Sequence, residues 1–490
     1  MLKAVANTPL YQQIAADLQA DIETGVYSVG QKVPSVRHFS QIKGVSISTV
    51  TQAYAWLEDQ GWLMARPQSG YYVRASFSPG VRVSANDALP PLSQGERPAE
   101  FTKSALINDM LAQFRRPSAI NMGAAIPAPE LLPLRQLQTH INKVARFHTA
   151  DVLDYQFSPG LLPLRRQLAT RMRDVGVRCA SDDIILTNGC AEALSVCLRA
   201  VTQPGDLIAV ESPCYYGILQ LAALQGLKII EIPTDPQTGI SPEALQLALE
   251  QWPIRLIVVN SRYSNPIGAA IPTARQKQLV ALAQRYDVGI LEDDIYGELG
   301  HPGVAGEQPV NTVLKTFDTD GRVMYCSSFS KTLAAGLRLG WCLPGRWFRQ
   351  VQEQQTFTTF SAPSLSQYAV SSYLQNGQYD RHLRQLRLTM AENSRRVIDA
   401  VHRHFPEGTR VTEPVGGFIL WVAMPPGVDA TRLYYEAVRH SIAIVPGDLF
   451  SNTAHFSHCM RLNTSIPWSV EVDRAVETLG RLAAGQLAAR

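Results

Sequence analysis

The stretch VMYCSSFSKTLAAGLRLGW (residues 323–341) places a run of strand-forming residues directly before two cations. Its first eight residues are mostly apolar or small, which is typical of an interior strand in a parallel sheet. Lys331 and Arg338 follow among leucines, although lysine and arginine are usually solvated surface groups. Taken alone, the stretch is equally compatible with a surface loop, so its meaning depends on the sequence around it.

Apolar runs of strand length recur upstream, and they read DIILTNG, LIAVESP, KIIEIPT, LIVVNSR and VGILEDD. Between them lie patterns with a helical period, such as EALSVCLRAV and RQKQLVALAQRY. Strands that alternate with helices predict an α/β fold with a mainly parallel sheet flanked by helices. In such sheets ligands bind at the carboxyl ends of the strands, and the polar motifs of this chain fall there.

Several of these strand ends carry residues that could contact a ligand. In TNGCAEAL, Gly189 allows a tight turn, and the N–H groups of Gly189, Cys190 and Ala191 would point at an anion from the start of a helix. The other residues are Tyr215 in ESPCYYG, Asn265 in SRYSNPIG, and Asp293 and Tyr296 in LEDDIYGEL. Each motif alone also has a structural explanation as a turn, a core tyrosine, an Asn–Pro corner or a solvated acid.

The order of these motifs resembles the site of the fold-type I aminotransferases, which bind pyridoxal 5'-phosphate. The chain contains, in sequence, an anion turn with glycine, an aromatic residue, Asn-Pro, Asp-x-x-Tyr, Ser-x-Ser-Lys and a later arginine. The resemblance covers about residues 119–485. It implies a mainly parallel sheet flanked by helices, followed by a smaller C-terminal α+β subdomain.

The resemblance also implies a role for each residue. Lys331 is expected to form a Schiff base with the cofactor aldehyde, which requires an unprotonated amine. Asp293 would keep the pyridine nitrogen protonated so that the ring withdraws electrons, and Tyr296 completes the catalytic group. The cofactor phosphate would be held by the Gly189 turn together with Ser328, Ser330 and Arg338.

Around the ring, Asn265 and Tyr296 are expected to hydrogen-bond the ring hydroxyl. Tyr215 would stack on the ring face. Cys190 stands where a hydroxyl residue is common in relatives. We therefore expect only the backbone N–H of Cys190 to take part in phosphate binding.

Three more positions follow from the resemblance. Arg461 in RLNTS matches the arginine that holds a substrate carboxylate, and the alternative is a strand-end arginine in a surface salt bridge. Gly123 in NMGAAIPAPELLP would line the substrate cleft with its backbone. Tyr155 in LDYQFSPGLLPLR matches a tyrosine that reaches the cofactor phosphate of the other subunit, so a homodimer is expected.

The N-terminal part of the chain has a different organisation. Leu10, Ile14, Leu18 and Ile22 form one apolar helical stripe, PSVRHFSQIKG has the length of a short second helix, and SISTVTQAYAWLEDQG predicts a third. Two β-prone runs, WLMA and YYVR, then flank the turn-rich RPQSG. Helix, short helix, turn, helix and a two-stranded wing is the order of a winged helix-turn-helix.

Residues 8–74 resemble the GntR-type DNA-binding domain in their PS-x-R and V-S-x-x-T-V-x-x-A-Y motifs and in a glycine-containing wing. Joined to an aminotransferase-like domain, they resemble the MocR subfamily of bacterial transcriptional regulators. The resemblance implies backbone contacts to double-stranded DNA from Arg37, Ser46, Thr49, Ser69 and Gly70. It implies base-edge contacts from Ser48, Thr51 and Gln52. The alternative is a helical dimerisation domain whose polar face is solvated.

Between these parts, residues 75–103 mix Pro, Ser, Gly and charge without periodicity, which predicts a linker over 75–118. Within that range SALINDMLAQFR can form an amphipathic helix that docks on the next domain. The expected domains are thus 8–74 and 119–485.

Composition narrows the classes further. A net charge of +3 over 490 residues indicates nothing about nucleic acid by itself, and no apolar run reaches the ~18 residues that a membrane span needs. The N-terminus shows no signal-peptide core, so we expect a cytoplasmic protein without a membrane partner. The seven scattered cysteines indicate reduced thiols. His301, His440, His455 and His458 show no metal spacing, so no metal site is expected.

The preferred interpretation is a transcriptional regulator that senses pyridoxal phosphate, an amino acid, or both, through the aminotransferase-like site. An active aminotransferase acting on an α-amino acid is the alternative, because sensing and turnover use the same lysine, aspartate and arginine. A β-lyase on the same scaffold is a third interpretation.

Overall fold

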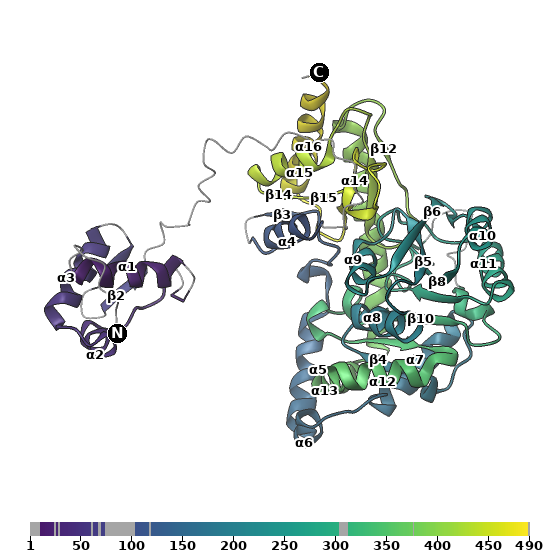
Figure 1. Ribbon diagram of the computed structural model, residues 1–490, viewed down its shortest axis with the longest axis horizontal. Coiled ribbons are helices and arrows are strands. Elements are labelled where there is room, and N and C mark those ends of the chain that lie inside the picture. The colour runs from purple at the N-terminus through teal and green to yellow at the C-terminus, as the bar shows by residue number, and fades with distance from the viewer. Residues whose placement is uncertain are drawn as a thin grey trace. The chain divides into compact units, whose positions relative to one another are not determined.

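The computed structural model describes residues 10–23, 26–27, 30–59, 62–66, 70–73, 103–116, 119–302, 312–375 and 377–488. The chain divides into two units, Met1–Pro98 and Ala99–Arg490, each with its own core (Figure 1). The predicted Ser69 and residues 75–102 and 117–118 of the expected linker lie outside the described residues. No helix in the described ranges is both long and apolar enough to cross a bilayer.

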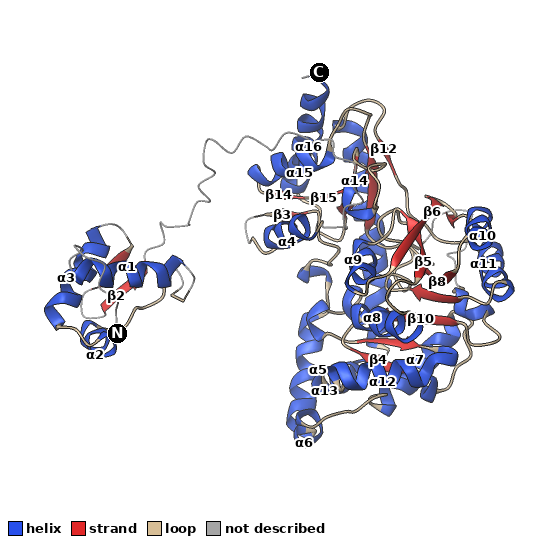
Figure 2. Ribbon diagram, in the orientation of Figure 1, coloured by secondary structure: helices blue, strands red, loops and turns tan. Residues whose placement is uncertain are grey.

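The described residues of the first unit form helices followed by a hairpin (Figure 2). They are α1 (Leu10–Glu23), α2 (Val36–Lys43), α3 (Ile47–Asp59), β1 (Leu63–Arg66) and β2 (Gly70–Val73), and the two strands pair antiparallel. This is the predicted winged helix-turn-helix order.

Local sequence explains the ends and the faces of these helices. The Ser35 hydroxyl accepts the His38 N–H at the start of α2, and Gly44 ends that helix in the left-handed region with φ 66°. The predicted apolar face of α3 is fully buried, with Val50, Ala53, Tyr54 and Leu57 packed in one core with Ile14 and Leu18 of α1. The polar face of α3 is left free for another contact.

The second unit is built on an eight-stranded sheet. Its strands, in spatial order, are β4 (Ile185–Thr187), β11 (Gly340–Leu343), β10 (Val323–Ser328), β9 (Gly289–Asp293), β8 (Ile254–Asn260), β5 (Leu207–Ser212), β6 (Lys228–Asp235) and β7 (Gly239–Ile240). From β10 to β6 every pair is parallel, whereas β11 runs antiparallel to both of its neighbours and β7 to β6. All six predicted strands are present.

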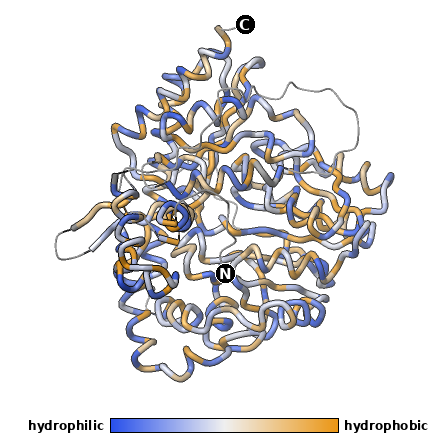
Figure 3. The backbone as a smooth tube through the Cα atoms, turned by 60° about the vertical axis from the view of Figure 1, so that its left-hand side comes forward, coloured by the Kyte–Doolittle hydropathy of each residue, from blue (hydrophilic) through white to orange (hydrophobic). Residues whose placement is uncertain are grey.

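Helices cover both faces of this sheet. One face packs against α8 (Cys190–Val201), α9 (Tyr216–Leu224) and α12 (Phe348–Thr359). The other packs against α10 (Pro242–Gln251), α11 (Thr273–Arg285), α5 (Leu134–Phe147), α7 (Leu162–Asp174) and α13 (Ser364–Leu374), with the short α6 (Thr149–Leu153) beside α5 and α13. Hydrophobic residues concentrate along the central strands and alternate with hydrophilic ones along the helices (Figure 3).

The smaller subdomain contains a four-stranded antiparallel sheet and three long helices. The strands, in spatial order, are β12 (Arg410–Val411), β13 (Ile419–Ala423), β16 (Cys459–Asn463) and β15 (Val445–Pro446). The helices are α14 (Gln378–His404), α15 (Ala430–Arg439) and α16 (Val470–Ala488). The predicted α/β fold with a smaller C-terminal α+β subdomain is therefore confirmed.

An N-terminal segment joins this C-terminal subdomain. α4 (Ser104–Gln113) occupies the predicted amphipathic stretch, and its Met110 lies in the core of the smaller subdomain. β3 (Ile120–Asn121) pairs parallel with β14 (Ile442–Ala443), far away in the sequence (Figure 1). The segment thus belongs to the second unit, while the expected boundaries at 74/75 and 118/119 stay predictions.

Candidate functional site

The parallel strands of the large sheet end at one edge with polar residues. β5 ends with Ser212, β8 with Asn260, β9 with Asp293 and β10 with Ser328. The turn after β4, which holds Gly189, reaches the same edge, because Ser328 pairs with Gly340 and Gly340 with Thr187. Residues from five separate sequence motifs therefore meet here, as expected for a ligand site in this class of sheet.

Asp293 is a buried acid without a cationic partner. Its side chain is almost inaccessible, and Oδ1 accepts the Ile295 N–H at 3.1 Å and the Cys190 S–H at 3.5 Å. Among the described residues it forms no ion pair. Burial raises the pKa of Asp293 to about 6. A carboxylate in this state can bind a positively charged N–H group of a ligand.

Lys331 is the amine of the site. Its Nζ donates to the Ala125 carbonyl at 2.5 Å, and its electrostatic neighbours are Arg461, Asp293, Cys190 and Arg338. Burial, reinforced by the charge of Arg461, lowers the pKa of Lys331 to about 8. The fraction of neutral amine at neutral pH is therefore much larger than for a solvated lysine, which favours nucleophilic attack.

Arg461 is a buried cation without an anion. Its side chain is 1% exposed; Nη1 donates to Asn265 Oδ1 at 2.9 Å and Nη2 to the Gly123 carbonyl at 2.6 Å. Nε has no hydrogen-bond partner, and no ion pair forms with any carboxylate in the described part of the chain. The guanidinium carbon lies 5.2 Å from the ring centre of Phe450 and 5.9 Å from that of Tyr216. Such a cation is ready to bind an anionic ligand.

Two tyrosines complete this part of the site. Burial raises the pKa of Tyr215 and of Tyr296 well above the ordinary value, so both keep their hydroxyl protons. Each has Asp293 and Arg461 among its electrostatic neighbours. They therefore supply neutral hydroxyl donors between the buried acid and the buried cation.

The turn between β4 and α8 forms a cradle for an anion. Gly189 precedes α8 with φ 80°, and a Cβ there would lie 2.8 Å from Arg338 Nη2, so only glycine allows this approach. Arg338 Nη2 donates to the Asn188 carbonyl at 2.7 Å. Ser328 Oγ accepts the Ser330 N–H at 3.3 Å. The helix N-terminus at Cys190 and Ala191, a guanidinium and hydroxyl groups suit a phosphate.

These groups fit pyridoxal phosphate. The cofactor carries an aldehyde, a pyridine nitrogen, a ring hydroxyl and a phosphate, and the site offers an amine, a carboxylate, neutral donors and an anion cradle in one cluster. Asp293, Arg461 and Arg338 are not neutralised by ion pairs among the described residues, which leaves their charges for a ligand.

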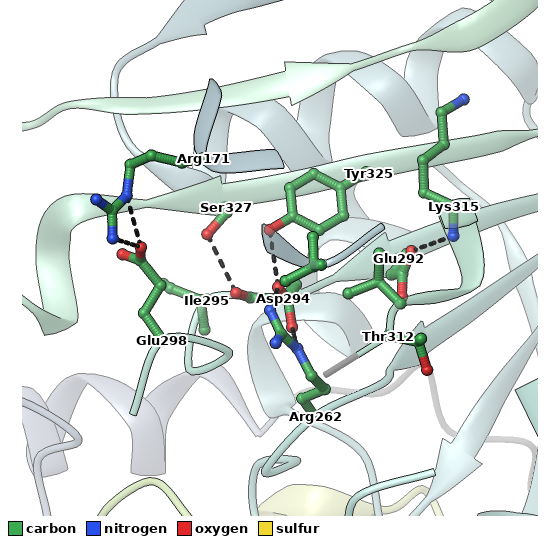
Figure 4. Close-up of polar contacts among 12 residues, drawn as sticks. Arg171, Arg262, Glu292, Asp294, Ile295, Glu298, Thr312, Lys315, Tyr325 and Ser327 are labelled. Carbon is green, nitrogen blue, oxygen red and sulfur yellow. Dashed lines mark hydrogen bonds and ion pairs between the residues drawn. The ribbon is translucent and has the colours of Figure 1, made fainter. Parts of the chain in front are cut away.

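Behind the site, Asp294 is held by partners within the chain (Figure 4). Arg262 Nε donates to Asp294 Oδ1 at 2.8 Å, and a second bond joins Nη2 to Oδ2. Tyr325 donates its hydroxyl to Asp294 Oδ2 at 2.7 Å, and Ser327 donates to the Asp294 carbonyl at 3.1 Å. On the other side of Asp293, both Glu292 oxygens accept backbone N–H groups, those of Leu314 and Lys315. These bonds fix the chain on both sides of Asp293.

Tyr155 does not join this cluster within its own chain. It is 62% exposed and stacks on Phe157 with ring centres 5.3 Å apart, while Phe360 lies at 6.3 Å.

In the first unit, the residues predicted to contact DNA lie around the start of α3. Ser46 Oγ is 2.8 Å from Ser48 Oγ and 2.7 Å from Thr49 Oγ1, and it accepts the Thr49 N–H, so it caps the helix. The Thr51 hydroxyl donates to the Ile47 carbonyl and keeps only its acceptor capacity for a ligand. Gln52 is exposed on the same helix.

Two other predicted DNA contacts are also exposed. Arg37 lies on α2, and Gly70 begins β2 with φ 108°, where a Cβ would approach Lys32 Cε to 3.1 Å. Lys32 was not predicted from the sequence; its position beside the wing adds a cation to this surface.

Sequence reasoning also missed Glu211, Asn260 and Tyr216 in the second unit. Glu211 and Asn260 lie at strand ends beside Asp293, and polarity at the end of an apolar run was the signal that could have identified them. Tyr216 follows a tyrosine that was identified, and only the fold brings it to Arg461.

Comparisons with known proteins agree with this geometry. Residues 131–479 match the family Aminotransferase class I and II, and residues 10–73 match Bacterial regulatory proteins, gntR family. The chain is 40% identical over 472 residues to the uncharacterized HTH-type transcriptional regulator YjiR of Escherichia coli (strain K12), covering 96% of this chain and 98% of that protein.

Two further similarities concern the whole chain and the second unit. The probable rhizopine catabolism regulatory protein MocR of Rhizobium meliloti is 27% identical over 449 residues, covering 90% of this chain and 87% of MocR. The α-aminoadipate aminotransferase LysN from Thermus thermophilus, solved with N-(5'-phosphopyridoxyl)-L-leucine, superposes with a TM-score of 0.70 at 25% identity. That match covers 79% of this chain and 99% of LysN.

Proposed function

Because the chain belongs to the aminotransferase class I and II family, carries a gntR-family domain at its N-terminus and is similar over most of its length to the regulatory protein MocR, we propose that it is a pyridoxal-phosphate-dependent sensor. Residues 8–74 would bind double-stranded DNA, and residues 119–485 would bind the cofactor and an amino acid. Residues 75–118 would connect these two domains. The observation that carries the proposal is the unneutralised group of Lys331, Asp293 and Arg461, which Arg461 joins from β16 of the smaller subdomain. A regulator that acts on bacterial DNA is expected in the cytoplasm.

Each residue of the site has a defined task in this proposal. When bound, pyridoxal phosphate supplies an electrophilic aldehyde and an electron-withdrawing ring. Lys331, as the Schiff-base lysine, would offer the neutral amine, and Asp293 would accept the hydrogen bond of the pyridine N–H. Asn265 and Tyr296 would hold the ring hydroxyl, and Tyr215 would hold the ring. The phosphate contacts are assigned to Gly189, Cys190, Ala191, Ser328, Ser330 and Arg338.

The effector is proposed to be an α-amino acid. Arg461 lies beside the Gly123 backbone, is the buried cation of the site, and would bind a carboxylate with its planar fork. An amine that reached Lys331 without a carboxylate would leave Arg461 unneutralised. The site therefore favours α-amino acids over simple amines.

A homodimer is part of the proposal. Tyr155, Phe157 and Phe360 form an exposed aromatic patch, although large aromatic side chains rarely gather on a free surface. A second copy that covers this patch would bring Tyr155 to the other subunit's phosphate, as the family resemblance implies. Amino-acid binding would then change the arrangement of the two subunits and of their DNA-binding units.

A catalytically active aminotransferase is the second candidate. It is supported by the lowered pKa of Lys331 and by the complete set of Lys331, Asp293 and Tyr296, since a site that only senses does not need to move protons repeatedly.

Visible absorbance of the purified protein, titrated with amino acids in the absence of keto acid, tests both candidates. Sensing without turnover predicts a stable spectral change with one amino acid, no released keto acid by mass spectrometry, and a changed affinity for operator DNA. Stoichiometric release of keto acid supports the aminotransferase. Operator affinity that is indifferent to the cofactor and to every amino acid would contradict the regulator.

A further inference from the structure

Three polar side chains form a row across neighbouring strand ends. Glu211 is the penultimate residue of β5, Asn260 is the last of β8 and Asp293 is the last of β9. The strands are adjacent in the order β5, β8, β9, and Asn260 pairs in register with Asp293. We name Glu211, Asn260 and Asp293 the acid–amide–acid row.

Asn260 links the two acids. Its backbone N–H donates to Glu211 Oε2 at 2.9 Å, and its side-chain amide lies close enough to Asp293 to lower the pKa of that carboxyl. Glu211 is 4% exposed and Asn260 6% exposed, so water has little access to either. Asn260 therefore joins Glu211 and Asp293 through its backbone N–H on one side and its side-chain amide on the other.

Two oxygens of the row have no hydrogen-bond partner among the described residues, namely Glu211 Oε1 and Asn260 Oδ1. If Glu211 were ionised, both atoms would be acceptors and neither could satisfy the other. A buried polar atom without a partner costs free energy, so this state is unfavourable. A proton on Glu211 would turn Oε1 into a donor and could satisfy both atoms with one bond.

The charges around Glu211 favour the same state. No cation in the described ranges forms an ion pair with it. The titratable groups near it are Asp293 on β9, the Cys214 thiol, and Glu231 on β6, which accepts the Ser212 hydroxyl beside Glu211. Burial, with the charge of Asp293 added, raises the pKa of Glu211 to about 8. At neutral pH the row then carries one negative charge, on Asp293.

We propose that Glu211 is a protonated positioning residue whose hydroxyl donates to Asn260 Oδ1 and thereby holds Asn260 Nδ2 against Asp293. The argument that Glu211 is protonated uses only the contacts of the acid–amide–acid row and does not depend on the proposed function. Its consequence rests on the proposed function: with one Asp293 oxygen bound by Asn260 Nδ2, the carboxylate has a fixed orientation for the pyridine nitrogen. A second negative charge at Glu211 would instead raise the pKa of Asp293 and favour its neutral form, which cannot bind the pyridine N–H as a carboxylate.

The first experiment uses the full-length protein without cofactor. Infrared difference spectra between pH 6 and pH 10 should show a protonated carboxyl band that titrates near pH 8 and is missing in Glu211→Gln. Glu292→Gln is the matched control, because Glu292 is also buried and both of its oxygens accept backbone N–H groups. Burial raises the pKa of Glu292 to about 7, so its own band should titrate below that of Glu211 and be missing in this variant. The Glu211 band should remain in that variant. A band at pH 8 that survives in Glu211→Gln, or none in the wild type, would overturn the proposal.

The second experiment follows the visible absorbance of the cofactor-loaded protein against pH. Glu211→Gln can still donate to Asn260 Oδ1 but cannot ionise, so it should lose the spectral change of the wild type near pH 8. Glu211→Leu cannot donate and should shift the midpoint of the band and retain cofactor roughly tenfold less well, the loss expected for one hydrogen bond to a charged group. Equal midpoints in all three proteins would contradict a positioning role.

The two experiments separate the two proposals. If the protein never binds pyridoxal phosphate, the proposed function fails, while the infrared titration still decides the protonation of Glu211. If Lys331→Ala abolishes the visible band but the infrared spectra of the wild type and Glu211→Gln are identical, the function stands and the row is wrongly described.

Discussion

Asp293 and Asp294 are consecutive, equally buried acids at the end of one strand, yet they lie in opposite surroundings. Asp294 is neutralised within the chain by Arg262 and is further bound by Tyr325. Asp293 receives only a backbone N–H, a thiol and an amide, and the nearby Arg461 and Lys331 likewise lack an ion-pair partner in the described structure. Buried charge that the fold satisfies serves stability, and buried charge that it leaves unsatisfied marks a ligand site.

Lys331→Ala should have the largest effect, because it removes the amine proposed to bond covalently to the cofactor. The visible band of lysine-bound cofactor should be lost completely. Lys315→Ala is the control, since Lys315 donates to Asp318 and the Val323 carbonyl at the opposite end of β10. A band that persists in Lys331→Ala would show that the site is wrongly assigned.

Arg262→Met should destabilise the protein most. It leaves Asp294 buried without its cation, which costs about 3–5 kcal/mol of unfolding free energy. Chemical denaturation monitored by far-ultraviolet circular dichroism measures this loss. The double variant Arg262→Met/Asp294→Leu should recover most of the lost unfolding free energy. If it does not, the two side chains stabilise the protein by more than neutralising each other.

Arg461→Met should behave in the opposite way. The substitution leaves the Asn265 and Gly123 oxygens without their donor, but it also removes a buried charge that has no ion-pair partner among the described residues. These effects oppose each other, so the unfolding free energy should change by less than about 1 kcal/mol. Amino-acid binding should weaken by at least about tenfold through the lost bonds to a carboxylate. Calorimetric titration measures the affinity, and Arg461→Lys should lie between. A large loss of stability would place Arg461 with Arg262 as a structural cation.

The pH dependence of the unfolding free energy tests whether Glu211 is a buried acid that keeps its proton. A pKa of about 8 for Glu211 in the folded state, against the ordinary 4.5, means that the folded protein holds this proton more tightly than the unfolded chain. Its contribution to stability is complete below pH 4.5 and decreases as the pH rises to 8. Glu211→Gln should therefore gain stability relative to the wild type at up to ~1.4 kcal/mol per pH unit across that window. Urea denaturation at pH 5, 6.5 and 8 measures the difference.

Glu292→Gln is the contrasting variant for that measurement. Its amide NH2 would face one of the Leu314 and Lys315 N–H groups, which costs about 1–3 kcal/mol. Burial raises the pKa of Glu292 to about 7, so its stability difference from the wild type should stop changing above pH 7, whereas that of Glu211→Gln should change up to pH 8. A pH-independent difference between Glu211→Gln and the wild type would rule out the raised pKa of Glu211.

The smallest effect is expected for an exposed cation of the first unit. Arg37→Ala should weaken DNA binding by about threefold to tenfold on all sequences and reduce the slope of log affinity against log salt by about 1. Fluorescence anisotropy at several salt concentrations measures both quantities. A sequence-dependent loss would mean that Arg37 contacts bases instead of phosphates.

Much of the architecture could be predicted because it depends on local patterns. The apolar face of α3, with Val50, Ala53, Tyr54 and Leu57, and the six strand runs are periodicities that burial requires. The joining of residues 103–121 to the C-terminal subdomain could not be fully predicted, because the β3–β14 pairing joins segments separated by most of the chain.

The same distinction applies to the site. The sequence alone determined the family, the strand-end position of Lys331, Asp293 and Gly189, and the presence of Arg461. Only the tertiary structure decided that Arg461 is buried without an anion, that the Cys190 thiol faces Asp293, and that Glu211 and Asn260 extend the site. The physical reason is that a residue's type and neighbours in sequence define its chemistry, whereas its solvation and its hydrogen-bond partners come from elements that only the fold brings together.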